Sequence, residues 1–170
     1  GKTAPTDALA DALKGRRVHF LPTGRYDNAV RLSQLLGYGV EDFFSEGKKG
    51  CPKASLPLVK AVIELRLVKS PEEIILMDKA CDLGYRMHTI ARKGIIPGRV
   101  EQEIVGDMEG LALGEGWGVS FPTILTQHGE IFHFHEHGHP IEPGKLLVID
   151  AGVENNEHYA SDLTRTYPTS

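Results

Sequence analysis

The spacing of hydrophobic positions changes along the chain, from helical repeats in the first two thirds to strand-like runs near the end. Apolar residues three and four apart, bounded by residues that favour helix ends, predict helices. Short apolar runs that stop at proline or glycine predict strands. On these criteria we expect two early strands, over residues 17–21 and 40–44, and helical segments within residues 1–16, 27–36, 58–68, 70–96 and 100–116.

The clearest helix start follows residue 69, where we place a domain boundary. Ser70 can cap the first turn, Pro71 suits the first helical position and Glu73 completes a capping box. The stripe that we expect this helix to turn towards the core consists of Ile74, Met77, Cys81 and His88.

The last third of the chain predicts a β-hairpin. Residues 145–152 form an apolar run ending in Asp150, and residues 158–166 alternate around Asp162. If the turn is centred near Asn156, the two aspartates face each other with Cβ atoms about 4.5–5.5 Å apart. Such a pair is repulsive unless a cation lies between the carboxylates, and carboxylate oxygens suit divalent metals. The alternative is two aspartates at unrelated strand ends, or a bulge that separates them.

Five of the eight histidines lie between His128 and His139. Four of them alternate, so an extended backbone would place them on one side, as in a metal-binding tract. The alternative is that one or two matter and the rest occupy a polar tip. Because glycine and proline follow, we expect the regular strand to end before His139, with His137 and His139 exposed.

Composition narrows the classes of function. A net charge of −4 gives no basic surface for nucleic acid, and no apolar run approaches the roughly 18 residues that cross a membrane. The two cysteines, Cys51 and Cys81, are far apart and outside any Cys-x-x-Cys pair. This usage favours a reduced, cytoplasmic protein without a signal peptide.

From Ser70 onward the chain resembles the pita-bread metallopeptidases, in the branch of Xaa-Pro aminopeptidases (aminopeptidase P) and prolidases. Three segments carry the resemblance: residues 68–74 (VKSPEEI), 147–152 (LVIDAG) and 160–166 (ASDLTRT). The resemblance implies an α+β fold containing part of a pita-bread (creatinase/aminopeptidase-like) catalytic domain.

The resemblance also divides the chain. Residues 70–170 would be the first half of the catalytic domain, and residues 51–69 a linker helix. Residues 1–50 would be the C-terminal part of a creatinase-type α/β N-terminal domain. We therefore expect the chain to be an internal fragment of a longer protein.

Roles for three residues follow from the resemblance. Asp150 would bind one metal ion in bidentate fashion and Asp162 would bridge two, usually manganese in this branch, with zinc or cobalt as alternatives. His133, seventeen residues before Asp150 and followed by an aromatic residue, matches the histidine that steadies the substrate and the tetrahedral intermediate. His135 is the second choice. We expect His133 to point towards the face that carries the aspartates.

The activity implied is that of a metal-dependent aminopeptidase, which removes the N-terminal residue from peptides with proline in second position. Alternatives are a prolidase that cuts Xaa-Pro dipeptides, a creatinase-like hydrolase without metal, and a non-catalytic module that binds proteins. Such a metal site uses five protein ligands, and residues 163–170 contain no histidine or glutamate. We therefore expect the chain alone to bind manganese weakly and to hydrolyse nothing. The parent would act on proline-containing peptides, as a homodimer.

Overall fold

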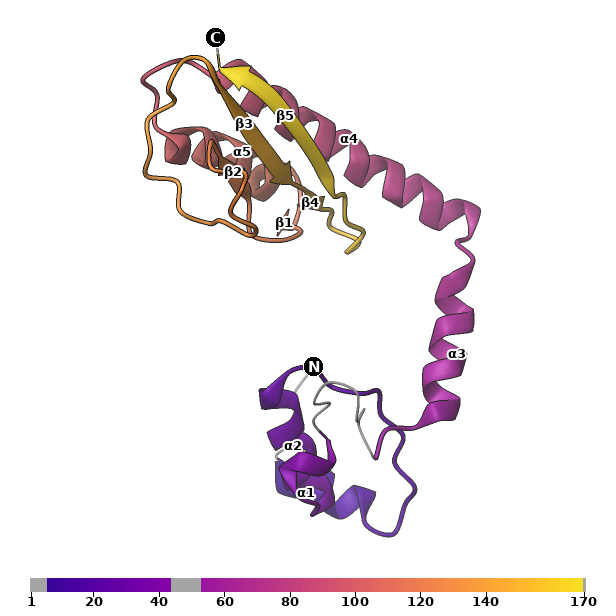
Figure 1. The fold of residues 1–170 in the computed structure, drawn as a ribbon. Coiled ribbons are helices and arrows are strands. Elements are labelled where there is room, and N and C mark those ends of the chain that lie inside the picture. Colours follow the sequence, from indigo (N-terminus) through magenta and orange to yellow (C-terminus); the bar gives the residue numbers. More distant parts are fainter. Residues whose placement is uncertain (1–5, 44–52, 170) are drawn as a thin grey trace. The chain divides into compact units, whose positions relative to one another are not determined.

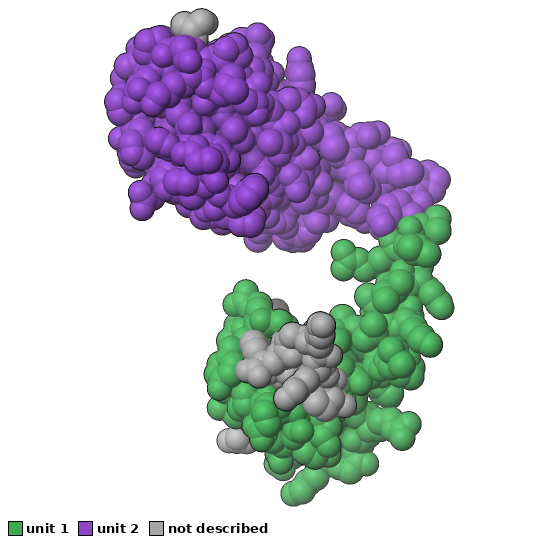
Figure 2. Space-filling view, in the orientation of Figure 1, with its two compact units in different colours: residues 1–68 green, residues 69–170 purple. Residues whose placement is uncertain are grey.

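The computed structural model describes residues 6–43 and 53–169. They belong to two compact units, residues 1–68 and residues 69–170 (Figure 2). The division falls beside the predicted helix start at Ser70. The finer domain ranges that the resemblance implies stay a prediction.

The described part of unit 1 is helical. Its elements are α1 (Thr6–Leu13), α2 (Tyr26–Leu36), the 3₁₀-helix η1 (Val40–Asp42) and α3 (Leu56–Leu67) (Figure 1). Residues that favour helix ends lie at the end of α2 and at the start of α3. Gly37 follows α2 in the left-handed region at φ 71°, and the Ser55 hydroxyl caps α3 by accepting from the Leu58 amide. Helix α2 begins at Tyr26, one residue before the predicted segment 27–36, with Arg25 in the capping position.

The two strands predicted in unit 1 are wrong within the described residues. Residues 17–20 alternate between exposed and half-buried side chains, as an extended segment would, but belong to no strand. An isolated strand is not stable without neighbours to pair its backbone. Residues 40–42 form η1 instead, since Glu41 and Asp42 disfavour strands; Phe44 lies outside the described residues. Among the described residues of unit 1, β structure is limited to a bridge at Thr23, and the assignment to an α/β domain stays a prediction.

Unit 2 opens with helix α4 (Pro71–Gly94), and its predicted capping box is present. The predicted core stripe is mostly wrong. Ile74, Met77 and Cys81 are exposed, and only His88 is buried. The side that is buried carries smaller residues, which let the helix axis come close to its neighbours. The buried positions are Ala80, Gly84, Met87, His88, Ala91 and Gly94.

Helix α5 (Glu101–Glu115) packs beside α4, and both cover one face of an antiparallel sheet (Figure 1). The sheet has the order β2-β3-β5, formed by β2 (Ile124–Thr126), β3 (Lys145–Ala151) and β5 (Leu163–Thr169). A smaller pair joins β1 (Gly118–Val119) to β4 (Val153–Glu154). None of the helices in the described ranges is both long and apolar enough to span a membrane.

The core of unit 2 lies between the helices and the sheet. Every second residue of β3 from Leu147 to Ala151 is fully buried there. The helical side chains that meet them include Met87, Ile104 and Met108. The intervening residues of β3 therefore lie on the other face of the sheet.

Candidate active site

The open face of the sheet carries Asp150. Its β3 neighbours on that face are Val148, half-buried, and Leu146, which is 62% exposed. Directly across the ladder, Asp150 pairs with Ile124 of β2 and with Thr164 of β5. Residues directly opposite in a sheet share a face, so these three positions form one row.

The predicted direct pairing of Asp150 with Asp162 is wrong. Thr164 is the partner of Asp150, and the bridge between Glu154 and Ala160 keeps the same register through the hairpin. The turn is centred one residue later than Asn156, which shifts the pairing by two residues. A shift of two keeps every side chain on its face, whereas a shift of one reverses them all. Extending the register makes Asp162 a diagonal neighbour of Asp150, for which about 7–8 Å is usual.

The two aspartates differ in their surroundings. Asp162 is exposed, whereas the Oδ1 atom of Asp150 is buried and has no hydrogen-bond partner among the residues that the structure describes. Burying a carboxylate oxygen without a partner is unfavourable, and a divalent cation is a partner that such an oxygen suits. Asp150 therefore fits one ligand position of a metal site. Among residues 6–43 and 53–169, no three histidine, cysteine, aspartate or glutamate side chains are grouped to hold an ion, so the described residues supply only part of one.

The loop of residues 128–141, called the histidine-rich loop below, begins against the same open face. A Cβ at Gly129 would lie 2.7 Å from Cγ2 of Val148, so the loop backbone rests on the residue next to Asp150 on that face. His133 is exposed, in a turn, with φ at 54°. Its positive φ interrupts the alternation expected from the sequence. That His133 points towards Asp150 stays a prediction.

The next two histidines lie beside β2. Nδ1 of His135 is 3.5 Å from the carbonyl oxygen of Thr123, and Nδ1 of His137 is 3.1 Å from that of Leu125. The expectation that His137 is exposed is wrong, because this contact leaves it half-buried. His139 is exposed as expected, with Nδ1 3.6 Å from the buried Glu101 carboxylate.

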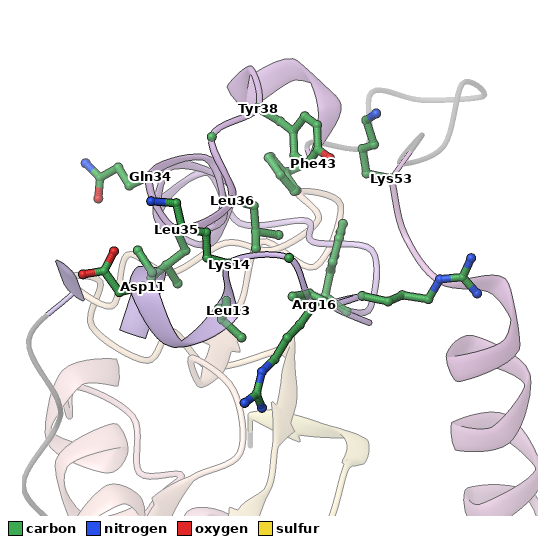
Figure 3. Close-up of a pocket in the computed structure, with 16 residues that line it drawn as sticks. Asp11, Leu13, Lys14, Arg16, Gln34, Leu35, Leu36, Tyr38, Phe43 and Lys53 are labelled. Atoms are coloured by element: carbon green, nitrogen blue, oxygen red, sulfur yellow. The ribbon is translucent and has the colours of Figure 1, made fainter. Parts of the chain in front are cut away.

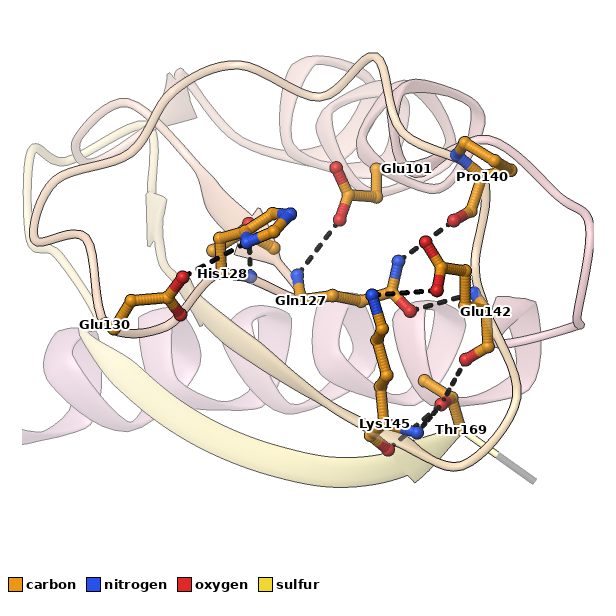
Figure 4. A network of polar contacts seen from close by, with 9 residues as sticks. Glu101, Gln127, His128, Glu130, Pro140, Glu142, Lys145 and Thr169 are labelled. Carbon is orange, nitrogen blue, oxygen red and sulfur yellow. Dashed lines mark hydrogen bonds and ion pairs between the residues drawn. The ribbon is translucent and has the colours of Figure 1, made fainter.

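Gln127 closes the histidine-rich loop at its base (Figure 4). Its side-chain amide donates to the Pro140 carbonyl at 2.9 Å, and its side-chain oxygen accepts from the Glu142 amide at 2.8 Å. Its backbone amide donates to Glu101 at 3.0 Å. One residue thus joins the two ends of the loop to each other and to α5.

The tip of the hairpin is fixed to the start of α4. The Asn155 side chain donates to the Leu76 carbonyl at 2.8 Å, and the Tyr159 hydroxyl donates to Glu73 at 2.9 Å. The Ser70 backbone amide and the Tyr159 hydroxyl both hydrogen-bond the Glu73 carboxylate and lower its pKa. The same carboxylate raises the pKa of Tyr159. Glu73 therefore caps α4 and holds the hairpin at once.

A hollow of about 730 Å³ in unit 1 offers a contrast (Figure 3). Its lining has aromatic residues such as Tyr38 and Phe43, and cations such as Lys14 and Arg16, with Asp11 as its carboxylate. Among the described residues that line it there is one carboxylate and no histidine or cysteine, so these residues lack the grouped ligands that a metal centre needs. Asp150 and its surroundings remain the better candidate.

Three features of the site were missed from sequence. The first is Thr164 as the partner of Asp150, which a turn centred one residue later would have given. The second is the contact of Gly129 with Val148. The third is the contact of buried His88 with Ala151, in which Nε2 lies 3.2 Å from the carbonyl oxygen. Neither pattern nor spacing signals a contact between segments so far apart in the chain.

Residues 75–170 match the model of metallopeptidase family M24. The Xaa-Pro aminopeptidase of Escherichia coli is 34% identical over 114 residues, which are 64% of this chain and 25% of that protein. The Xaa-Pro dipeptidase of Pyrococcus horikoshii is 33% identical over 142 residues, 81% of this chain and 39% of that protein. The chain thus spans about a quarter to two fifths of the length of these relatives.

Solved structures agree. The prolidase of Pyrococcus horikoshii aligns with all of this chain and 46% of its own, at a TM-score of 0.77 and 25% identity. Proline aminopeptidase P II of Yersinia pestis aligns with 65% of this chain and 26% of its own, at a TM-score of 0.61 and 32% identity. The predicted α+β, pita-bread architecture is confirmed by these likenesses.

Proposed function

The chain belongs to metallopeptidase family M24, and we propose that it is part of an Xaa-Pro aminopeptidase, which removes the first residue of peptides with proline in second position. The structural observation that carries the proposal is the buried, unpartnered oxygen of Asp150 on the open face of the sheet. The match of residues 75–170, which include Asp150 and Asp162, to family M24 supports it, as does the similarity of the chain to an Xaa-Pro aminopeptidase.

In this proposal Asp150 and Asp162 hold divalent cations, of which manganese is our first choice, ahead of zinc and cobalt. When bound, such cations supply an activated water and polarise the scissile carbonyl. His133 donates a hydrogen bond to the oxygen that becomes negative in the transition state, a contribution of about 3–4 kcal/mol for one well-placed donor. His135 takes that role if His133 points away. The loop closed by Gln127 keeps these histidines beside the aspartates.

The chain by itself supplies two aspartates and one histidine to the site. Two metal ions carry four positive charges, which several carboxylates must offset. We therefore propose that the 170-residue chain binds manganese weakly and cleaves no peptide, and that the longer protein does both. We also propose that the longer protein acts in the cytoplasm as a homodimer.

A prolidase is the second candidate. It is supported by the dipeptidases of two Pyrococcus species, which match 77% and 81% of this chain. The two activities differ in substrate length. A protein-binding module without catalysis is disfavoured, since both candidate metal-binding aspartates are retained.

The test is an assay of the full-length protein with manganese on an Xaa-Pro dipeptide and on the same sequence extended by two residues. Release of the first residue from the longer peptide supports the aminopeptidase, and cleavage of the dipeptide alone supports the prolidase. Asp150→Asn should abolish either activity, while Asp82→Asn, an exposed aspartate of α4, is the matched control. No metal-dependent cleavage of either peptide would overturn the proposal.

A further inference from the structure

Helix α4 contacts the hairpin that carries both aspartates at four places along its length. Two of them, at Glu73 and Leu76, hold the tip. The other two lie beside the aspartates themselves, at residues one helical turn apart. The four contacts are Glu73 with Tyr159, Leu76 with Asn155, Gly84 with Ser161, and His88 with Ala151.

His88 reaches the residue that follows Asp150. It is 5% exposed, and its Nε2 lies 3.2 Å from the Ala151 carbonyl oxygen. Since a carbonyl can only accept, Nε2 carries the proton of this bond. Nδ1 is buried and has no hydrogen-bond partner in the described ranges. An apolar side chain of similar size would avoid this unsatisfied atom, so stability alone does not account for a histidine here.

Gly84 reaches the residue that precedes Asp162. A Cβ at Gly84 would lie 2.5 Å from Oγ of Ser161 and 3.0 Å from Cδ1 of Leu163. Ser161 is itself held, because its Oγ accepts from the Val153 amide at 3.0 Å. Glycine is therefore the residue that lets the Ser161 backbone approach α4 without displacing its neighbours.

We propose that α4 sets the separation of the two carboxylates, with His88 fixing Asp150 through Ala151 and Gly84 fixing Asp162 through Ser161. One turn of helix, about 6 Å for four residues, separates the two contacts. That length is close to the spacing usual for diagonal neighbours in a sheet, about 7–8 Å. His88 and Gly84 act through the hairpin backbone, from the packed side of the sheet, and are positioning residues. The link from this separation to metal binding rests on the proposed function.

The experiment compares two substitutions at His88 in the full-length protein. His88→Met keeps the size of the side chain and removes the donor, whereas His88→Gln keeps an amide donor within reach of Ala151. Residues that orient metal ligands typically change metal affinity by about 10–100-fold when replaced. We expect a weakening of manganese binding in that range for His88→Met, measured by titration calorimetry, and affinity close to the unchanged protein for His88→Gln.

Two further variants separate positioning from folding. Gly84→Ala should also weaken manganese binding, because the added methyl group displaces Ser161. Ile104→Val, a core change on α5 that lies outside the four contacts of α4 with the hairpin, should lower the melting temperature and leave the affinity unchanged. The inference is overturned if His88→Met lowers the melting temperature as Ile104→Val does but leaves manganese affinity unchanged.

Crystal structures of the metal-free proteins give a readout that needs neither metal nor activity. The distance between the Asp150 and Asp162 carboxylates should change in His88→Met and return in His88→Gln; an unchanged distance in His88→Met rejects the positioning role. If the unchanged protein binds manganese but cleaves no Xaa-Pro peptide, the proposed function fails, and the affinity comparison still decides this inference. If the unchanged protein binds no divalent metal, the crystallographic distance between the two carboxylates decides this inference.

Discussion

The two faces of the β2-β3-β5 sheet differ in how deeply their side chains are buried. On the face towards α4 and α5, Leu147 and Ile149 are fully buried, and packing there holds the unit together. On the open face, Leu146 is 62% exposed and Asp150 keeps an unpartnered buried oxygen. Burying such an atom costs stability, so packing does not account for Asp150. We therefore expect stability and the proposed chemistry to depend on alternate residues of the same strand.

The strongest test of this contrast is Asp150→Asn in the full-length protein. We expect metal-dependent peptide cleavage to fall by at least about 100-fold, because replacing residues that merely support a metal ligand already costs up to that much. The melting temperature of the metal-free protein should not fall, since the amide removes an unpartnered charge. A lower melting temperature with activity retained would reverse the assignment of the two faces.

The packed face should respond in the opposite way. Ile149→Ala should lower the free energy of unfolding by about 2–5 kcal/mol, the usual range for emptying a packed core position. Leu146→Ala, on the open face of the same strand, should change it by about 0.5 kcal/mol or less. Urea unfolding of the 170-residue chain, followed by the fluorescence of its single tryptophan, Trp117 in unit 2, measures both. Equal losses would contradict the contrast.

Gln127→Ala tests how the loop is held on the open face. Losing its two side-chain hydrogen bonds should destabilise unit 2 by about 1–3 kcal/mol, at about 0.5–1.5 kcal/mol each. Amide hydrogen exchange should rise across residues 128–141 and stay unchanged in β3. Gln102→Ala, an exposed glutamine of α5, is the control. If exchange in residues 128–141 stays slow, Gln127 does not close the loop.

The smallest expected effect is the pH dependence of stability that Glu73 contributes where the hairpin tip meets the start of α4. The pKa of Glu73 is lowered, first by the Ser70 amide and then by the Tyr159 hydroxyl. A lowered folded-state pKa adds stability above the ordinary glutamate pKa, and this is lost as the pH falls through the folded value. Between pH 7 and pH 3, the melting temperature should fall less in Glu73→Gln than in the unchanged chain. Identical pH profiles would show that the contact does not stabilise.

Local sequence signals predicted a helix end better than they predicted strands or the buried side of a helix. The capping box at Ser70 is confirmed, because it depends on a few neighbouring residues. Within the described residues, the strands predicted at 17–21 and 40–44 are wrong, because a strand needs partners that the local pattern does not specify. The buried side of α4 was also wrong, since small residues, rather than Ile74 and Met77, face the sheet.

The candidate site shows the same limit. The motif identified Asp150 and Asp162, but not their register, because one residue in the turn decides whether Asp162 or Thr164 faces Asp150. The role of His133 stays a prediction. The contact of His88 with Ala151 joins residues 63 positions apart, and no spacing rule predicts it.

The way Gln127 holds the histidine-rich loop has an evolutionary consequence. Its side chain bonds only backbone atoms of Pro140 and Glu142, so the anchor does not depend on which side chains the loop carries. Each doubling in the length of a flexible loop costs only about 0.6 kcal/mol. Apart from the proposed catalytic histidine, residues between 128 and 139 can therefore vary in number and kind among homologues while the loop base stays in place.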